Sequence, residues 1–225
     1  TVQLLSGKND TGNYIRLSSP IVNANIEGQY RLADLGNIIQ NSIQPYFNTG
    51  DTSLATVQPY HFSFRVDVMY DSVFAAFVPG LTSMQALHAA GSFSNNDGMN
   101  MDLATPSVTY QGNVISDLKL EARTTENGLQ INGGIAHLKS SSLDLYNTRL
   151  NAVALNNNIN FDLGTDDQRG KNKYFIAGLV SQPTAGIYSI HLKPDSLVLN
   201  YQNWTVTPDN RITISPDNIV ANDFV

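Results

Sequence analysis

The chain has 225 residues, a formal net charge of -6, no cysteine, and 14% charged residues, well below the roughly 25% typical of soluble domains. The negative charge and the lack of a basic run argue against a nucleic-acid partner, because binding a phosphate backbone needs concentrated positive charge. Without cysteine, a disulfide framework and a thiolate metal site are both excluded.

No stretch approaches the roughly 20 consecutive apolar residues of a membrane span. The chain opens at Thr1 without a signal peptide and closes on a segment that has the pattern of a strand. We therefore expect a fragment of a longer protein.

The first 60 residues predict three strands, a helix and a linker. Alternating apolar and polar residues indicate strands at 2–6, 13–18 and 20–27. From Tyr30 to about Gln44, apolar residues recur at spacings of three and four, which predicts an amphipathic helix ending before Pro45. This helix either covers the end or edge of a sheet, which we favour, or acts as a gate over an apolar trough. The polar stretch 48–59 is expected to be a linker or long loop.

From His61 onward, alternating segments follow at intervals of roughly 8–12 residues, as in sandwiches, barrels and stacked β ribbons. One apolar run, 73–81, is expected to form a short buried helix stopped by Pro79 and Gly80. The loop 164–172 has the densest charge and is expected to be solvated. The predicted strands lie near 61–70, 85–93, 98–104, 106–111, 114–124, 128–139, 142–154, 157–163, 173–180, 184–193, 196–201, 204–207, 210–215 and 218–224.

Candidates for catalysis or metal binding are few and scattered. Four histidines lie on or next to predicted strands without a second ligand at suitable spacing, which indicates solvated or packed side chains: His61, His88, His137 and His191. The segment 94–98 has one charge and no distal glutamate, so a hairpin turn at Asp97-Gly98 explains it better than a calcium loop. Asp166-Asp167 is interpreted as a like-charge pair in a mobile loop, not as a glycosidase pair. We therefore expect no enzyme activity, no cofactor and no structural metal.

Three stretches resemble the periplasmic β-repeat region of TamB-type translocation and assembly module proteins of Bacteroidota, within the wider AsmA-like group. Together they span most of the chain. They are 26–30 with the amphipathic helix that follows, 73–81 with the strand at 91–93, and 196–201 with 204–206, Asn210, Ile212, Ile214 and 222–224.

The resemblance implies a fold and a role. The fold would be mostly β: a long curled sheet that forms an open apolar groove (a β-taco), with one or two short helices. Residues 1–60 would contribute strands, the helix and the linker, and 61–225 the main curled sheet of one continuous groove. The alternation fits equally well the alternative, a closed β-sandwich acting as a binding or adhesion module of a surface protein. A right-handed β-helix enzyme ranks third.

By resemblance, the expected function is a non-enzymatic periplasmic segment of an inner-membrane-anchored protein. It would conduct phospholipid to the outer membrane and support outer-membrane protein assembly, the latter with a barrel partner bound by other parts of the protein. Exposing a 16-carbon acyl chain costs on the order of 10 kcal/mol, so the groove needs an unbroken apolar lining. The candidate lining residues are Phe62, Phe64, Val66, Leu118, Leu120, Leu129, Ile131, Ile159, Phe161, Leu163, Ile190, Leu192, Leu197, Leu199, Ile212 and Ile214.

Overall fold

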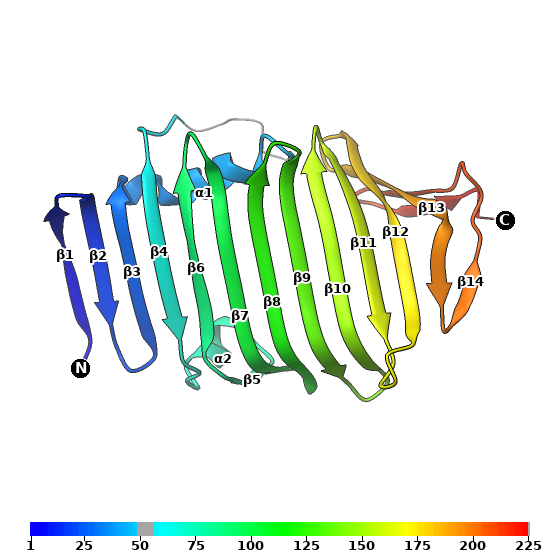
Figure 1. Cartoon of the computed structure of the whole chain (residues 1–225), viewed down its shortest axis with the longest axis horizontal. Coiled ribbons are helices and arrows are strands. Elements are labelled where there is room, and N and C mark those ends of the chain that lie inside the picture. The colour runs from blue at the N-terminus through cyan, green and yellow to red at the C-terminus, as the bar shows by residue number, and fades with distance from the viewer. Residues whose placement is uncertain (49–55, 225) are drawn as a thin grey trace.

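The computed structural model describes residues 1–48 and 56–224, and it is one large antiparallel sheet accompanied by short helices (Figure 1). In these residues sixteen strands belong to the sheet, and fourteen of them follow one another across it almost in chain order. The other two, β5 and β14, pair with β7 and β13.

The N-terminal elements are β1 (Gln3–Asn9), β2 (Gly12–Ser18), β3 (Val22–Gln29), the 3-10 helix η1 (Leu32–Asp34) and the helix α1 (Leu35–Ile43). The middle of the chain forms β4 (His61–Val68), α2 (Phe74–Phe77), β5 (Leu81–Met84), β6 (Leu87–Ser94), β7 (Gly98–Tyr110), β8 (Asn113–Thr125) and β9 (Gly128–Lys139). The last part forms β10 (Asp144–Leu155), β11 (Asn158–Asp166), β12 (Asn172–Thr184), β13 (Ile187–Leu199), β14 (Gln202–Trp204), β15 (Arg211–Ile214) and β16 (Ile219–Asn222).

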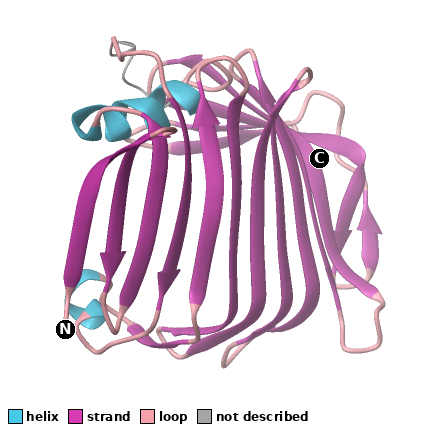
Figure 2. Cartoon of the chain, turned by 60° about the vertical axis from the view of Figure 1, so that its left-hand side comes forward, coloured by secondary structure: helices cyan, strands magenta, loops and turns pink. Residues whose placement is uncertain are grey.

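The sheet is curled and open (Figure 2). In the strand order β1 lies at one edge and β16 at the other. The accessible surface of the chain is 13512 Å², whereas a compact monomer of this mass would expose roughly 10,000 Å². The predicted fold, a mostly β curled open sheet with short helices, is confirmed. The two sheets of a closed sandwich are not formed in the described residues, and the antiparallel pairing excludes a parallel β-helix there.

The predicted elements need four corrections. The apolar run 73–81 is not buried: α2 projects from the end of the sheet between β4 and β5, and Phe77 is 78% exposed. The segments 98–104 and 106–111 form one strand, because pairing with β8 continues on both sides of Pro106. The segments 184–193 and 196–201 also form one strand, β13.

The fourth correction concerns the charged loop. Its first residues extend β11, and the side chain of Asp166 is only 9% exposed because it accepts hydrogen bonds from Arg149 at 3.0 and 3.3 Å. The predicted linker 48–59 lies largely outside the described residues. The strands before it are nevertheless part of the same sheet as those after it, because β3 pairs with β4 along its whole length.

At β13 the sheet divides, and Asn210 occupies the junction. The first half of β13 pairs with β15 and the second half with β14. Asn210 is fully buried (0% exposed), and its side chain accepts a hydrogen bond from the backbone N–H of Leu192 and donates one to the carbonyl of the same residue, both at 2.8 Å. It also donates to the carbonyl of Thr207 at 2.7 Å. The side chain thus replaces a strand partner where β15 has not yet begun.

We expect Asn210→Ala to destabilise the protein by roughly 2–5 kcal/mol, because it leaves a buried N–H and a buried C=O of Leu192 without partners. Asn203→Ala, at an exposed position of β14, is the matched control and should cost less than about 1 kcal/mol. Urea unfolding followed by circular dichroism measures both. Equal losses would show that the buried side chain does not stabilise the junction.

Candidate functional site

The two faces of the sheet follow from the strand registers. Residues directly opposite each other in antiparallel strands point to the same face, and every second residue along a strand shares it. We call the face on which α1 packs the inner face, because Ile38 of α1 belongs to one buried cluster with Phe62 and Phe93 of the sheet.

Four rows of side chains cross the inner face from strand to strand. Row 1 contains Phe62, Phe93, Met99, Thr124, Leu129, Ala154, Ile159, Val180, Ile190 and Ile212. Row 2 contains Ile15, Ile26, Phe64, Gly91, Met101, Ala122, Ile131, Ala152, Phe161, Gly178 and Leu192. Row 3 contains Leu4, Leu17, Ala24, Val66, Ala89, Leu103, Leu120, Gly133, Leu150, Leu163, Ile176 and Leu197. Row 4 contains Val22, Val68, Leu87, Thr105, Leu118, Ile135, Thr148, Thr165, Tyr174 and Leu199.

The structure brings all sixteen predicted lining residues together on this face. Fifteen of them are members of the four rows, and Ile214 lies two positions beyond Ile212 on β15. None of the four rows contains an acidic or basic residue. The four rows of the inner face are therefore uncharged and mainly apolar, with Thr105, Thr124, Thr148 and Thr165 among their members.

A strap formed by residues 30–48 covers rows 1 and 2. Ile38 is 1% exposed and lies in the buried cluster, whose sheet members all come from these two rows and the adjoining Tyr60. Partly buried Leu35 and Ile43 extend the same contact. Rows 1 and 2, where the strap packs, are called the covered strip below. The helix thus lies over the ends of the strands, the covering arrangement favoured from the sequence.

Both ends of the strap are fastened to the sheet. At its start, Nδ2 of Asn13 donates to the carbonyl oxygen of Tyr30 at 2.6 Å. At its end, the N–H of Asn48 donates to Oδ1 of Asn157 at 2.9 Å, and the N–H of Asn157 donates to the carbonyl of Tyr46 at 3.0 Å. The ring of Phe47 stacks on that of Tyr188 in β13 at 6.2 Å. The strap therefore joins strands that are far apart in the sheet.

Rows 3 and 4 form the open strip. No member of row 3 is buried, although almost all are aliphatic, and Leu163 is 38% exposed. In row 4 only Thr105 and Thr165 are buried. None of these residues belongs to the cluster beneath the strap. Within the open strip, row 3 is a continuous, partly exposed aliphatic row, and row 4 adds both apolar residues and three threonines beside it.

Glycines in row 2 make room for aromatic rings. A Cβ added at Gly91 would lie 2.9 Å from the ring of Phe64, and one at Gly178 would lie 3.2 Å from the ring of Phe161. Each ring therefore covers the neighbouring glycine on the next strand. Phe64 and Phe161 can therefore lie flat against the sheet within the covered strip.

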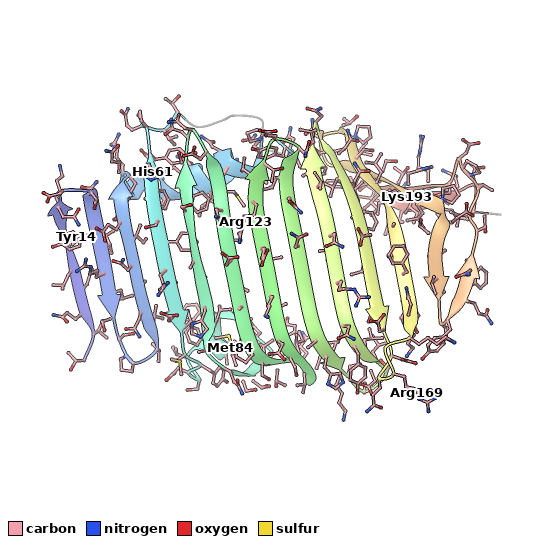
Figure 3. The ribbon with its side chains drawn as sticks, viewed as in Figure 1. Tyr14, His61, Met84, Arg123, Arg169 and Lys193 are labelled. Atoms are coloured by element: carbon pink, nitrogen blue, oxygen red, sulfur yellow. The ribbon has the colours of Figure 1, made fainter. Side chains whose placement is uncertain are left out.

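The outer face carries the polar and charged side chains. In Figure 3, which is viewed with α1 behind the sheet, the labelled Arg123 stands on the near face, and its Nη2 donates to Oδ1 of Asp102 at 2.6 Å. His88 contacts Asp67 at 2.5 Å. Sequence reasoning missed such pairs because the partners are on neighbouring strands.

The shifted pKa values belong mainly to exposed groups away from the open strip. The hydrogen bond with His137, at 2.6 Å, lowers the pKa of Asp144. The backbone N–H of Lys171 lowers the pKa of Asp167. On the strap, burial raises the pKa of Tyr30. The His137–Asp144 pair lies beyond the end of the open strip, because His137 is two positions past Ile135 of row 4 on β9.

Among the described residues there is no group of three or more His, Cys, Asp or Glu side chains that could hold a metal ion. Neither helix in that part of the chain has the length and composition of a membrane span. No family model, curated protein or solved structure matches this chain, so the TamB-type resemblance stays a prediction.

The two strips differ in a way that a single charge can test. Leu129→Asp in the covered strip, where the leucine is 2% exposed, should cost several kcal/mol, because the carboxylate is buried without a partner. Leu163→Asp in the open strip should cost about 1 kcal/mol or less, because its carboxylate reaches water. Thermal unfolding compares the two variants. Equal destabilisation would mean that the open strip is covered in solution.

The glycines provide a second test of packing. Gly91→Ala should destabilise by roughly 1–3 kcal/mol, because its Cβ would lie 2.2 Å from the carbonyl oxygen of Asn100. Gly133→Ala, in row 3, should be neutral or stabilising by up to about 1 kcal/mol, because its nearest neighbour, Leu150 Cβ, is 3.5 Å away. Chemical unfolding of both variants checks the difference. A stable Gly91→Ala variant would contradict the packing described here.

Proposed function

We propose that the open strip binds the hydrocarbon chains of phospholipid, and that the chain is a non-enzymatic segment of a TamB-like lipid conduit. In this proposal the segment works in the periplasm, as part of an inner-membrane-anchored protein that conducts lipid to the outer membrane. Support of outer-membrane protein assembly, with a barrel partner bound elsewhere, belongs to the same proposal and rests on the resemblance alone.

The observation that carries the proposal is row 3. Its residues are nearly all aliphatic, none is charged, and none is buried by the described part of the chain. Leu4 is 66% and Leu163 38% exposed, and the other aliphatic residues of the row are partly exposed between them. Extended apolar patches mark interaction sites.

The dimensions of the strip suit a lipid chain. Row 3 runs through twelve strands from β1 to β13, about 53 Å at roughly 4.8 Å per strand. One leaflet of a bilayer core is about 15 Å thick, which approximates the reach of one acyl chain. Several chains therefore fit end to end along the row.

The energetics favour a hydrocarbon ligand. Each methylene removed from water contributes about 0.8 kcal/mol, so covering much of a 16-carbon chain contributes on the order of 10 kcal/mol before the losses of association are subtracted. The same contact covers the exposed leucines of row 3. A polar head group needs no such cover and stays in water beside the strip.

Lipid loading tests the proposal directly. The purified protein, extracted with organic solvent, should release phospholipid detectable by mass spectrometry, and the delipidated protein should take up a fluorescent acyl-chain lipid. Leu163→Asp should lower uptake about tenfold or more, because a carboxylate pressed against hydrocarbon loses its hydration.

The matched control for this variant is Gln130→Asp, which adds the same side chain to an exposed position on the outer face of β9. It should load lipid as the unchanged protein does. Absence of bound lipid together with absence of uptake would reject the proposal, and so would normal uptake by the folded Leu163→Asp variant.

A further inference from the structure

A cavity of about 560 Å³ lies between the start of the strap and the first two strands. Its volume is within the range of roughly 300–1,000 Å³ that is usual for small-molecule sites. Ile15 and Leu32 give it an apolar part, and Ser6, Lys8 and Arg31 give it polar groups. Tyr14, which also lines it, is labelled in Figure 3 near the β1 edge of the sheet.

The charge at this cavity is unlike that of the rest of the inner face. Continuing row 1 beyond Phe62 through Gly28 and Asn13 leads to Lys8 in β1. The extended row is therefore uncharged up to β1, where it ends at the basic residue Lys8. Arg31, at the start of the strap, lines the same cavity.

The acidic groups nearby leave these cations available. Asp34, whose side chain is 16% exposed, lies 3.9 Å from Nε of Arg31, at the limit of an ion pair, and the Arg31 side chain itself is 65% exposed. Glu27 belongs to the outer face, where it accepts hydrogen bonds from Asn9 and Thr11, which lower its pKa. Its charge is therefore directed away from the cavity.

The cavity is continuous with the open strip. Ile15 lines the cavity, and two positions further along β2, on the same face, is Leu17 of row 3. Leu17 pairs with Leu4 of β1, which is 66% exposed. A molecule with an anionic group between Lys8 and Arg31 can therefore place a hydrocarbon chain on row 3.

We propose that this cavity binds the phosphate-bearing head group of an anionic lipid whose acyl chains lie on the open strip. The inference rests on the proposed function and adds the head-group class to it. Lys8 and Arg31 supply charge-assisted hydrogen bonds to the phosphate oxygens, which are stronger than neutral ones. Ile15 and Leu32 contact the first methylenes of the chains.

The test uses short-chain phosphatidylglycerol and a diacylglycerol with the same acyl chains, binding to the full chain. The unchanged protein should bind the phosphatidylglycerol at least tenfold more tightly than the diacylglycerol. The Lys8→Gln/Arg31→Gln variant should lose that preference and keep its affinity for diacylglycerol. Both residues are exposed, so the fold should be retained.

The control variant Arg65→Gln/Lys119→Gln removes the same charge from exposed positions on the outer face. It should keep the preference, and an equal loss in the control would overturn the inference in favour of a general effect of net charge. Binding of both lipids without preference would overturn the head-group site and leave the proposed function standing. Inorganic phosphate that binds as tightly as the lipid would show that free phosphate, not lipid, is the ligand. Failure of both lipids to bind would count against the proposed function itself.

Discussion

The structure depends on one imbalance: a single-layer sheet has a wide apolar face, and in residues 1–48 and 56–224 one short strap covers part of it. The hydrophobic effect scales with the area removed from water, so the buried residues concentrate where the strap lies. Ile38, Phe62 and Leu129 are buried there, while the aliphatic residues of row 3 are only partly buried. The covered strip therefore supplies most of the stability of the fold. The open strip can gain or lose contacts with a ligand without unfolding the protein. A ligand that covers the open strip adds its binding free energy to the stability of the folded state.

The strap also contributes to the curl of the sheet. From β3, beside its first anchor, to β11, beside its second, there are seven strand spacings, about 34 Å along the sheet. The twelve residues of η1 and α1 extend about 20 Å, and residues 30–31 and 44–48 of the strap span the remainder. The strap is hydrogen-bonded to the curled sheet at Tyr30 and at Asn157, so it links strands that are far apart across the curve. The same short segment therefore buries the covered strip and helps to hold the shape of the open one.

Much of this arrangement can be predicted from the sequence. The predictions that were wrong or missing have identifiable physical causes. Within each regular segment, alternation assigns the predicted lining residues to one face, because side-chain direction has a period of two. Leu192 and Leu197, five positions apart on β13, share that face only because the pairing with β12 shifts register between them. Alternation says nothing about which rows a distant segment covers: Asn48 bonds Asn157, 109 residues away. The exposure of Phe77 was missed because an apolar run has the same composition whether it enters a core or projects from a sheet end. Asp166 was misplaced because its partner, Arg149, is on the neighbouring strand.

The uniformity of the open strip bears on movement as well as on binding. In the proposed function, a hydrocarbon chain on row 3 that advances by one strand, about 4.8 Å, exchanges one uncharged neighbour for another, aliphatic at every position except Gly133. Because the contacts before and after each step are similar, the binding free energy of the hydrocarbon chain changes little. A tightly bound chain can therefore still move along the row. A pocket shaped for one ligand would instead create a deep minimum and stop it. In the proposed arrangement the charged cavity at Lys8 and Arg31 is the point where a lipid is held by its head group, and the rows beyond it are built for passage.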